Sequence, residues 1–243
     1  MNIGQDFQKF TKNISEQDMI DYTKKIVKSS QTPMILEERE MRAYTMSVFD
    51  RLMMDRIIWI AGPVESRMSA IVEAQLMFLD SIEKKDITMY LSTPGGSVNA
   101  GLGIVSAMNM IKSDVSTICM EMCASMGSVL LSSGTKGKRH ITLFGEVMTH
   151  MVSHGTEGNV QDTRISHLQA EKYNYILFKL LAKNCGKTFE ELYELSRRDK
   201  WFNADDAVKF GLVDKVIPVP NIPTITELLE GFDDYYSKEI LLK

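Results

Sequence analysis

Short apolar runs alternate with longer segments in which apolar residues recur every three or four positions. Residues 57–64, with the sequence IIWIAGPV, form the first such run and predict a buried strand. The segment after it opens at Ser66 and carries a regular apolar stripe, so it predicts a helix. This stripe consists of Met68, Val72, Leu76 and Leu79.

The same strand-helix unit recurs twice more along the chain. Residues 87–91 predict a strand, and residues 94–112 predict a turn that leads into a helix. Residues 115–122 predict the next strand, and residues 125–134 predict the apolar helix that follows it. A further strand is expected at residues 146–150. Repeated units of this kind predict an α/β fold, in which helices cover a parallel sheet.

The second half of the chain is predicted to be mainly helical. A long helix is expected over about residues 160–183, and Gly186 is its stop signal. Its apolar stripe consists of Tyr173, Ile176, Leu177 and Leu180. Two shorter helices follow, with start signals at Thr188, Glu191 and Asn203. Residues 212–217 predict the last strand.

These elements form one α/β domain at residues 33–217. Residues 1–32 are polar and end at SSQTP, where a proline breaks any helix, so we interpret them as a mobile or processed leader. Residues 218–243 form a variable tail, in which no periodic pattern predicts an element. The chain is therefore expected to have three parts, and the middle part carries the fold.

Composition and charge narrow the class of function. With 44% apolar and 25% charged residues, the 243-residue chain is expected to be globular. Its formal charge of −4 argues against nucleic acid as a partner, and the basic cluster TKGKRH at 135–140 is interpreted as a solvated loop. We find no apolar window long enough to span a bilayer and no signal-peptide pattern at the start. A cytoplasmic protein without a membrane partner is therefore expected.

Neither the cysteines nor the histidines form a recognisable ligand pattern. Cys119, Cys123 and Cys185 show no CxxC spacing, so we interpret them as reduced thiols buried in the fold. His150 and His154 are four residues apart, but their segment is not helical and has no further ligand nearby. The sequence therefore predicts no metal site.

Unusual residues follow three of the predicted strands. The loop after residue 91 contains Gly95 and Gly96, Ser125 follows the strand that ends at 122, and His150 ends the strand at 146–150. Ligands of parallel α/β sheets gather beyond the carboxyl ends of the strands, so these residues are expected to lie close together.

The surroundings of Ser125 are typical of a nucleophile at a sharp strand-to-helix turn. Its segment, CASMG, is a G-x-S-x-G pattern with Cys in the first small position. The N–H groups of Gly96 and Met126 could hold a developing oxyanion, and His150 could act as general base with an Asp to orient it. On spacing alone, Ser125 could equally be a packing or capping serine.

The chain resembles the family of Clp protease proteolytic subunits from about Pro33 to Ile217. The resemblance rests on STPGGSVNAGLGI, IKSDVSTIC, ASMGSVLLSSGTKGKR and GLVDKVI, which occur in the family's order and nearly its spacing. It implies Ser125 as nucleophile, His150 as general base and then acid, and Asp199 in RRDKWF as the orienting carboxylate. It also places Gly96 and Met126 at the oxyanion positions.

The resemblance further implies an architecture and partners. The fold would be crotonase-like, with the long helix near 160–183 as a protruding handle and residues 153–160 as a strand that pairs with peptide substrate. Two stacked seven-membered rings of identical chains would enclose the sites. An AAA+ unfoldase such as ClpX, ClpA or ClpC would use the ATP, so no cofactor is expected in this chain. Its docking residues would be Tyr90, Met110, Ile118, Met120 and Ile217.

Two alternatives belong to other classes of function. A catalytically silent ring subunit would keep the fold but typically lose one of the three triad residues, and all three are present here. A crotonase-type acyl-CoA enzyme would share the paired N–H site, but it would not need a Ser, His and Asp set. The sequence therefore favours a serine endopeptidase that degrades unfolded proteins to short peptides.

Overall fold

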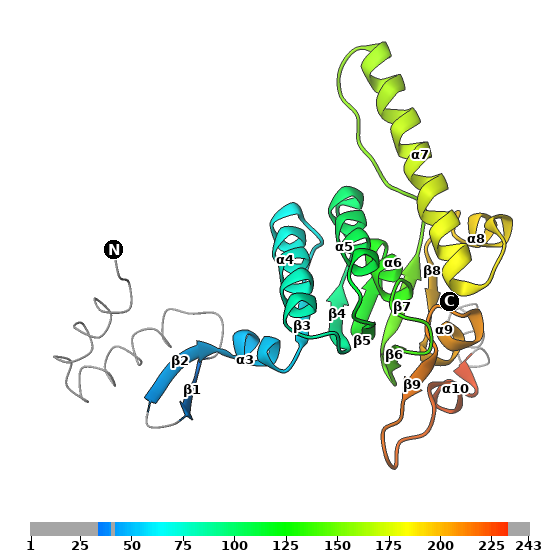
Figure 1. Cartoon of the computed structure of the whole chain (residues 1–243). Coiled ribbons are helices and arrows are strands. Elements are labelled where there is room, and N and C mark those ends of the chain that lie inside the picture. Colours follow the sequence, from blue (N-terminus) through cyan, green and yellow to red (C-terminus); the bar gives the residue numbers. More distant parts are fainter. Residues whose placement is uncertain (1–33, 40–41, 233–243) are drawn as a thin grey trace, which may run out of the picture. The chain divides into compact units, whose positions relative to one another are not determined.

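The computed structural model describes residues 34–39 and 42–232, and the chain divides into two compact units at Asp55. In the first unit, β1 (Met34–Arg39) and β2 (Arg42–Ser47) form an antiparallel hairpin (Figure 1). Helix α3 (Val48–Met54) follows, and a capping box between Ser47 and Asp50 starts it. The predicted leader, residues 1–32, lies outside the described residues.

The second unit contains a seven-stranded sheet. Its strands are β3 (Ile57–Ala61), β4 (Ile87–Thr93), β5 (Val115–Ala124), β6 (Arg139–Thr142), β7 (Glu146–Thr149), β8 (Lys200–Phe202) and β9 (Lys215–Ile217). The order is β3-β4-β5-β6-β9, and β7 pairs with the end of β5 on one side and with β8 on the other. All pairings are parallel except that of β7 with β8. The predicted α/β fold with a parallel sheet is therefore confirmed.

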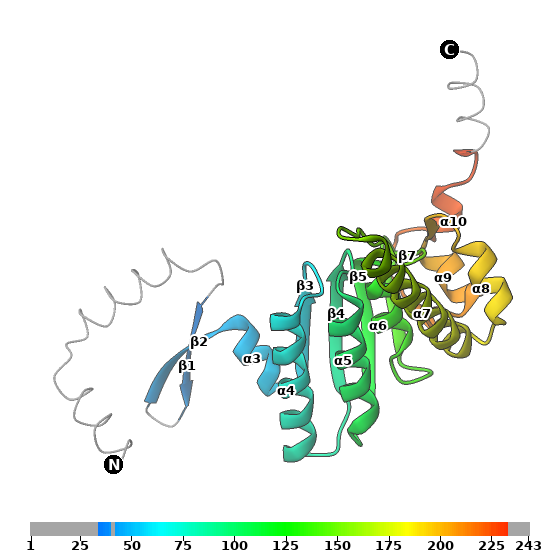
Figure 2. The same cartoon turned by 90° about the horizontal axis from the view of Figure 1, so that it is seen from above.

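The helices of this unit pack beside the sheet and at its far end. They are α4 (Ser66–Ile82), α5 (Val98–Met110), α6 (Met126–Ser132), α7 (Val160–Cys185), α8 (Phe189–Leu195), α9 (Ala204–Phe210) and α10 (Ile225–Leu228). Figure 2 shows α4, α5 and α6 side by side along one face of the sheet. Helix α7 has 26 residues and ends at Gly186 in the left-handed conformation, as its stop signal predicts. Its function as a handle between rings stays a prediction.

The core lies between the sheet and these helices. Along β4, Ile87, Met89 and Leu91 are fully buried, and the residues between them are partly exposed. Alternation of this kind places one face of a strand against the core. Leu76 and Leu79 of the predicted α4 stripe pack on this side and are at most 3% exposed. Burial of each such side chain contributes about 2 kcal/mol.

The interpretation of residues 135–140 as a solvated loop was wrong for the last two of these residues, which belong to a strand. Strand β6 begins at Arg139, whose side chain is 3% exposed. Its guanidinium donates to both carboxylate oxygens of Asp214, with the shorter bond at 2.6 Å, and to the carbonyls of Ser132 and Asn184. Because each nitrogen of this guanidinium donates to an acceptor, a basic residue is tolerated in the core.

Strands β1 and β2 and helix α3 were not predicted, and three elements of the second unit also differ from the prediction. Residues 212–217 form a shorter strand, because the N–H groups of Leu212 and Val213 donate to the Ala207 carbonyl at the end of α9. Strand β8 was not predicted, since its three residues are too few to show a period. Helix α10 was also not predicted, although Thr224 and Glu227 form a capping box that the sequence contains.

We expect Asp214→Asn to lower the free energy of unfolding by roughly 3 kcal/mol, because it leaves the buried charge of Arg139 unpaired. Burial acts to raise the pKa of Asp214, but hydrogen bonds and charge from Arg139 outweigh it and lower the pKa. A lowered folded-state pKa stabilises the protein above the ordinary Asp pKa, and this contribution is lost as the pH falls through the folded value.

Urea denaturation at neutral pH and at about pH 3 measures both effects. Asp206→Asn is the matched control, because its exposed pair with Lys209 is worth under about 1 kcal/mol. If the two variants lose equal amounts of unfolding free energy, the Arg139–Asp214 pair contributes little to stability.

Candidate active site

Ser125 lies at the sharp turn between β5 and α6, with φ +55° and ψ −119°. Non-glycine residues rarely adopt positive φ, and such a backbone persists only where its surroundings hold it. Here the Ser125 N–H donates to the Met148 carbonyl on β7 at 2.8 Å. The Ser125 carbonyl accepts from the N–H of Ser128 at 3.0 Å and from its hydroxyl at 2.7 Å. These bonds hold the Ser125 hydroxyl at the carboxyl end of the sheet.

Two glycines after β4 allow the neighbouring loop to approach this turn. A Cβ atom on Gly95 would lie 2.7 Å from the Ser125 Cβ and 2.6 Å from the Ala124 carbonyl oxygen. A Cβ atom on Gly96 would collide with the Val64 carbonyl oxygen. Both glycines also have positive φ. The glycine pair is therefore required by both space and backbone conformation.

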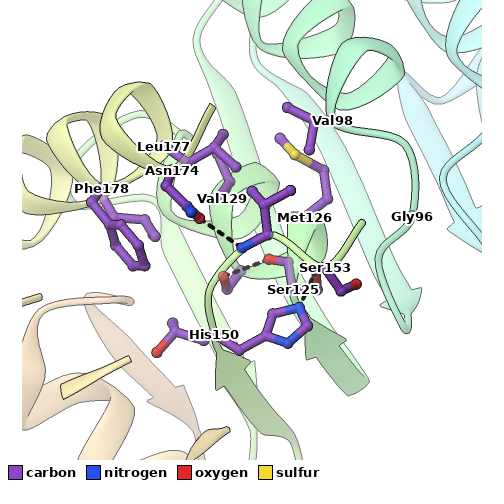
Figure 3. Close-up of a pocket in the computed structure, with 14 residues that line it drawn as sticks. Gly96, Val98, Ser125, Met126, Val129, His150, Ser153, Asn174, Leu177 and Phe178 are labelled. Carbon is purple, nitrogen blue, oxygen red and sulfur yellow. Dashed lines mark hydrogen bonds between the residues drawn. The ribbon is translucent and has the colours of Figure 1, made fainter. Parts of the chain in front are cut away.

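His150 directly follows β7, and its imidazole points to the Ser125 hydroxyl (Figure 3). The distance from His150 Nε2 to Ser125 Oγ is 2.8 Å, and His150 Nδ1 lies 3.4 Å from Asp199 Oδ1. Asp199 directly precedes β8, which pairs with β7. The second distance exceeds the 2.7–2.9 Å or so of a charge-assisted hydrogen bond, so the Asp199 contact is the looser of the two.

Gly96 and Met126 line the same cavity as Ser125 and His150. Within the described residues, neither backbone N–H has a hydrogen-bond partner. That of Met126 is free because the first N–H groups of a helix have no intrahelical acceptor. The cavity is about 60 Å³, and the apolar residues that line it are Val98, Met126, Val129, Val152, Leu177, Phe178 and Leu181. Ser128, Thr149, Ser153 and Asn174 are further polar residues of the lining. The site thus presents two free N–H donors and a mainly apolar recess next to the Ser125 hydroxyl.

Comparison with known proteins agrees with this geometry. A sequence model of the Clp protease family matches residues 38–220. The chain belongs to the Clp protease family. Similar relatives include the ATP-dependent Clp protease proteolytic subunits of Streptococcus pyogenes serotype M5 (strain Manfredo), serotype M49 (strain NZ131) and serotype M1. Each is 44% identical over 189 residues, which covers 76% of this chain and 96% of the relative. The family resemblance seen in the sequence is therefore confirmed.

In this member of the Clp protease family, the surroundings of Cys123 and Cys185 do not favour either thiol as a nucleophile. Cys119, Cys123 and Cys185 are free and buried, as predicted. Burial raises the pKa of the Cys123 thiol well above its ordinary value and that of Cys185 to about 11. A thiol attacks as its thiolate, and a raised pKa disfavours the thiolate near neutral pH.

The described residues contain no group of three or more His, Cys, Asp or Glu side chains arranged to hold a metal ion. His154 is the second histidine of the sequence pattern. The centroid of its ring lies 5.7 Å from the ring centroid of His167 on α7. Across the same residues, no helix is both long and apolar enough to cross a bilayer.

Most of the residues implied for partner docking lie on neighbouring strands. Tyr90 on β4 pairs in register with Ile118 on β5, and Ile217 on β9 pairs with a residue of β6. Met120 follows on β5, whereas Met110 ends helix α5 and is 70% exposed. Binding of a partner at these residues stays a prediction.

Residues 153–160 were expected to form a strand that pairs with substrate. The structure has no strand there, because no neighbouring strand of the described chain supplies hydrogen bonds to this segment. Pairing with a bound peptide stays a prediction for this segment.

The sequence missed the contribution of α7 to the cavity. Of the predicted stripe, Leu177 is buried but Ile176 is 37% exposed, and the buried face of α7 also contains Asn174 and Phe178. Asn174 is polar, so the hydrophobic pattern did not include it, yet its side-chain oxygen accepts the N–H of Val152 at 2.7 Å. The apolar residues Phe178 and Leu181, three positions apart, were the sequence signal that could have indicated this face of α7.

Proposed function

We propose that this chain is a serine endopeptidase and the proteolytic subunit of an ATP-dependent Clp protease, the name that its relatives carry. The observation that carries the proposal is the 2.8 Å contact between His150 Nε2 and Ser125 Oγ. A nucleophile and a base within hydrogen-bond distance are the minimum for acyl transfer. Membership of the Clp protease family supports the same reaction.

In the proposed reaction, Ser125 Oγ attacks the carbonyl carbon of a peptide bond while His150 Nε2 takes the hydroxyl proton. Asp199 holds the imidazole in the required tautomer and stabilises its charged form. The N–H groups of Gly96 and Met126 bind the oxyanion, a contribution of about 3 kcal/mol for each donor. His150 then gives the proton to the leaving amine. In the second half of the reaction, water attacks the acyl carbon while His150 takes a proton from it, and His150 returns this proton to Ser125 Oγ as the ester bond breaks.

The cavity beside Ser125 supports a preference for apolar side chains next to the cleaved bond. Most of its lining from α6 and α7 is apolar, including Val129, Leu177 and Phe178, and Ser128 and Asn174 are the polar residues on these helices. Such a recess favours an apolar group by about 0.8 kcal/mol for each buried CH₂. Unfolded protein segments, which expose such side chains, fit this site.

We further propose two stacked heptameric rings of identical chains, fed by an AAA+ ATPase that consumes the ATP, in the cytoplasm. No cofactor is required in this chain for the reaction above. Exposed apolar side chains support subunit contacts: Ile71, Phe78 and Ile82 on α4 are 51–64% exposed, and Ile165 and Leu168 on α7 are 65% and 61% exposed. Apolar residues gathered on one element are typical of interaction surfaces.

The two alternatives are less well supported. A silent ring subunit would not need the Ser125 hydroxyl aligned with His150 on a strained turn. An acyl-CoA enzyme of the crotonase type would use the paired N–H groups, but the contact from His150 to Asp199 would serve no purpose in it.

Labelling with a fluorophosphonate probe tests the proposal, because this probe reacts with activated serines. The purified protein is labelled, digested and mapped, and its assembly state is measured by native mass spectrometry. We expect one adduct, on Ser125, and none in the Ser125→Ala variant. Assembled rings that give no adduct, with or without an ATPase, would favour the silent subunit instead.

A further inference from the structure

Two buried hydroxyl groups join the segments that carry His150 and Asp199. Thr149 Oγ1 and Ser196 Oγ are 2.9 Å apart, and the two residues are 1% and 0% exposed. Thr149 directly precedes His150, and Ser196 lies three residues before Asp199. A hydrogen bond between buried hydroxyls is shielded from competing water, so it fixes the two segments relative to each other.

The segment that carries Asp199 is connected to Thr149 at both of its ends. At one end, Ser196 caps α8, and its N–H donates to the carbonyl of the fully buried Leu192 at 3.0 Å. Its hydroxyl contacts Thr149. At the other end, Lys200 begins β8 and pairs in register with Thr149. Residues 197–199 therefore form a short arch, and the residues at both of its ends are connected to Thr149.

Asp199 depends on this arch for its position. Its side chain is 62% exposed, so packing does not hold it in place. Among the described residues, its one polar partner is His150, at 3.4 Å. That separation is already long for a charge-assisted hydrogen bond, so a small shift of the arch removes the contact.

We propose that Thr149 and Ser196 are positioning residues that hold Asp199 within reach of His150. The proposal rests on the proposed function, since it assigns the two hydroxyls to the orientation of the general base. Their hydroxyls bond to each other rather than to Ser125 or His150. Thr149 also lines the cavity beside Ser125. A displacement of about 1 Å can cost on the order of 100-fold in rate, so the bond is relevant to catalysis.

Thr149→Val tests the bond, because valine keeps the branched shape and removes the hydroxyl. We expect kcat for a fluorogenic peptide to fall between tenfold and 100-fold, roughly, with KM nearly unchanged. Ser196→Ala should have the same effect, and Thr149→Ser should restore most of the rate. Thr117→Val is the control: its fully buried hydroxyl donates to the Leu131 carbonyl, away from the site, and its loss should leave kcat unchanged.

The decisive comparison is made in an Asp199→Asn background. If the arch acts through Asp199, adding Thr149→Val there should change kcat by less than about twofold, because groups that act as a unit are not additive. A full, multiplicative loss in that background would overturn the proposal, as would an unchanged kcat for Thr149→Val alone. These outcomes are distinct from a failure of the proposed function, in which the wild-type protein would neither cleave peptides nor label at Ser125.

Discussion

In the Ser125→Ala variant, we expect kcat for peptide hydrolysis to fall about 10⁶-fold, with the assembly state of the protein unchanged. The reason is chemical: alanine has no nucleophile, and the His150 imidazole then has no proton to accept from position 125. The residual rate would come from binding and from the oxyanion donors alone. Hydrolysis of a short fluorogenic peptide, with native mass spectrometry of the same samples, measures both quantities.

Ser106→Ala is the matched control for this variant. Ser106 is exposed on α5, and its hydroxyl donates to the Leu102 carbonyl within the same helix. Its replacement should leave kcat within about twofold, because exposed sites far from the chemistry contribute little. Retention of full activity by Ser125→Ala would mean that another residue is the nucleophile.

The second large effect is expected for Asp199→Asn. With a buried orienting carboxylate, this change costs a serine protease roughly 10⁴-fold in kcat. Asp199 is 62% exposed and 3.4 Å from His150, so solvent screens part of its charge. We therefore expect a loss on the order of 10³-fold, with KM nearly unchanged, from steady-state kinetics on the same peptide.

Asp206→Asn is the control for the Asp199 variant, because it removes an exposed carboxylate that pairs with Lys209. It should leave the rate unchanged. If Asp199→Asn also leaves the rate unchanged, a different group orients His150, and the arch that carries Asp199 has no catalytic purpose.

The central part of the site could be predicted from the residues alone. Parallel strands place their carboxyl ends at one edge of a sheet, so the sequence predicts that Gly96, Ser125 and His150 meet there. The pairing of β7 with the end of β5 brings the last two together. Small residues around Ser125 predicted the turn, because a sharp strand-to-helix turn leaves no room for larger ones.

Asp199 could be assigned only through the family resemblance. It precedes a three-residue strand, β8, which is too short for a hydrophobic period to reveal. The antiparallel pairing of β8 with β7 joins segments that are far apart in the sequence. Nothing in the local pattern of RRDKWF distinguishes its carboxylate from those of other exposed loops.

Buried polar residues are a further feature that the hydrophobic pattern could not predict. Arg139, Asn174 and Ser196 are each at most 5% exposed, although their residue types are usually found at the surface. Each is tolerated because a specific partner satisfies its hydrogen bonds, and the partners are distant in sequence. Periodicity records only where apolar residues recur, so it carries no information about such pairs.

The bond from the Ser125 N–H to the Met148 carbonyl has a consequence for how activity can be lost. This bond restrains the backbone of Ser125 in a conformation that costs about 1–3 kcal/mol. Met148 lies on β7, and His150 directly follows the last residue of this strand. A rearrangement that detaches β7 would therefore remove both the restraint on the Ser125 backbone and the contact from His150 Nε2 to Ser125 Oγ in a single event.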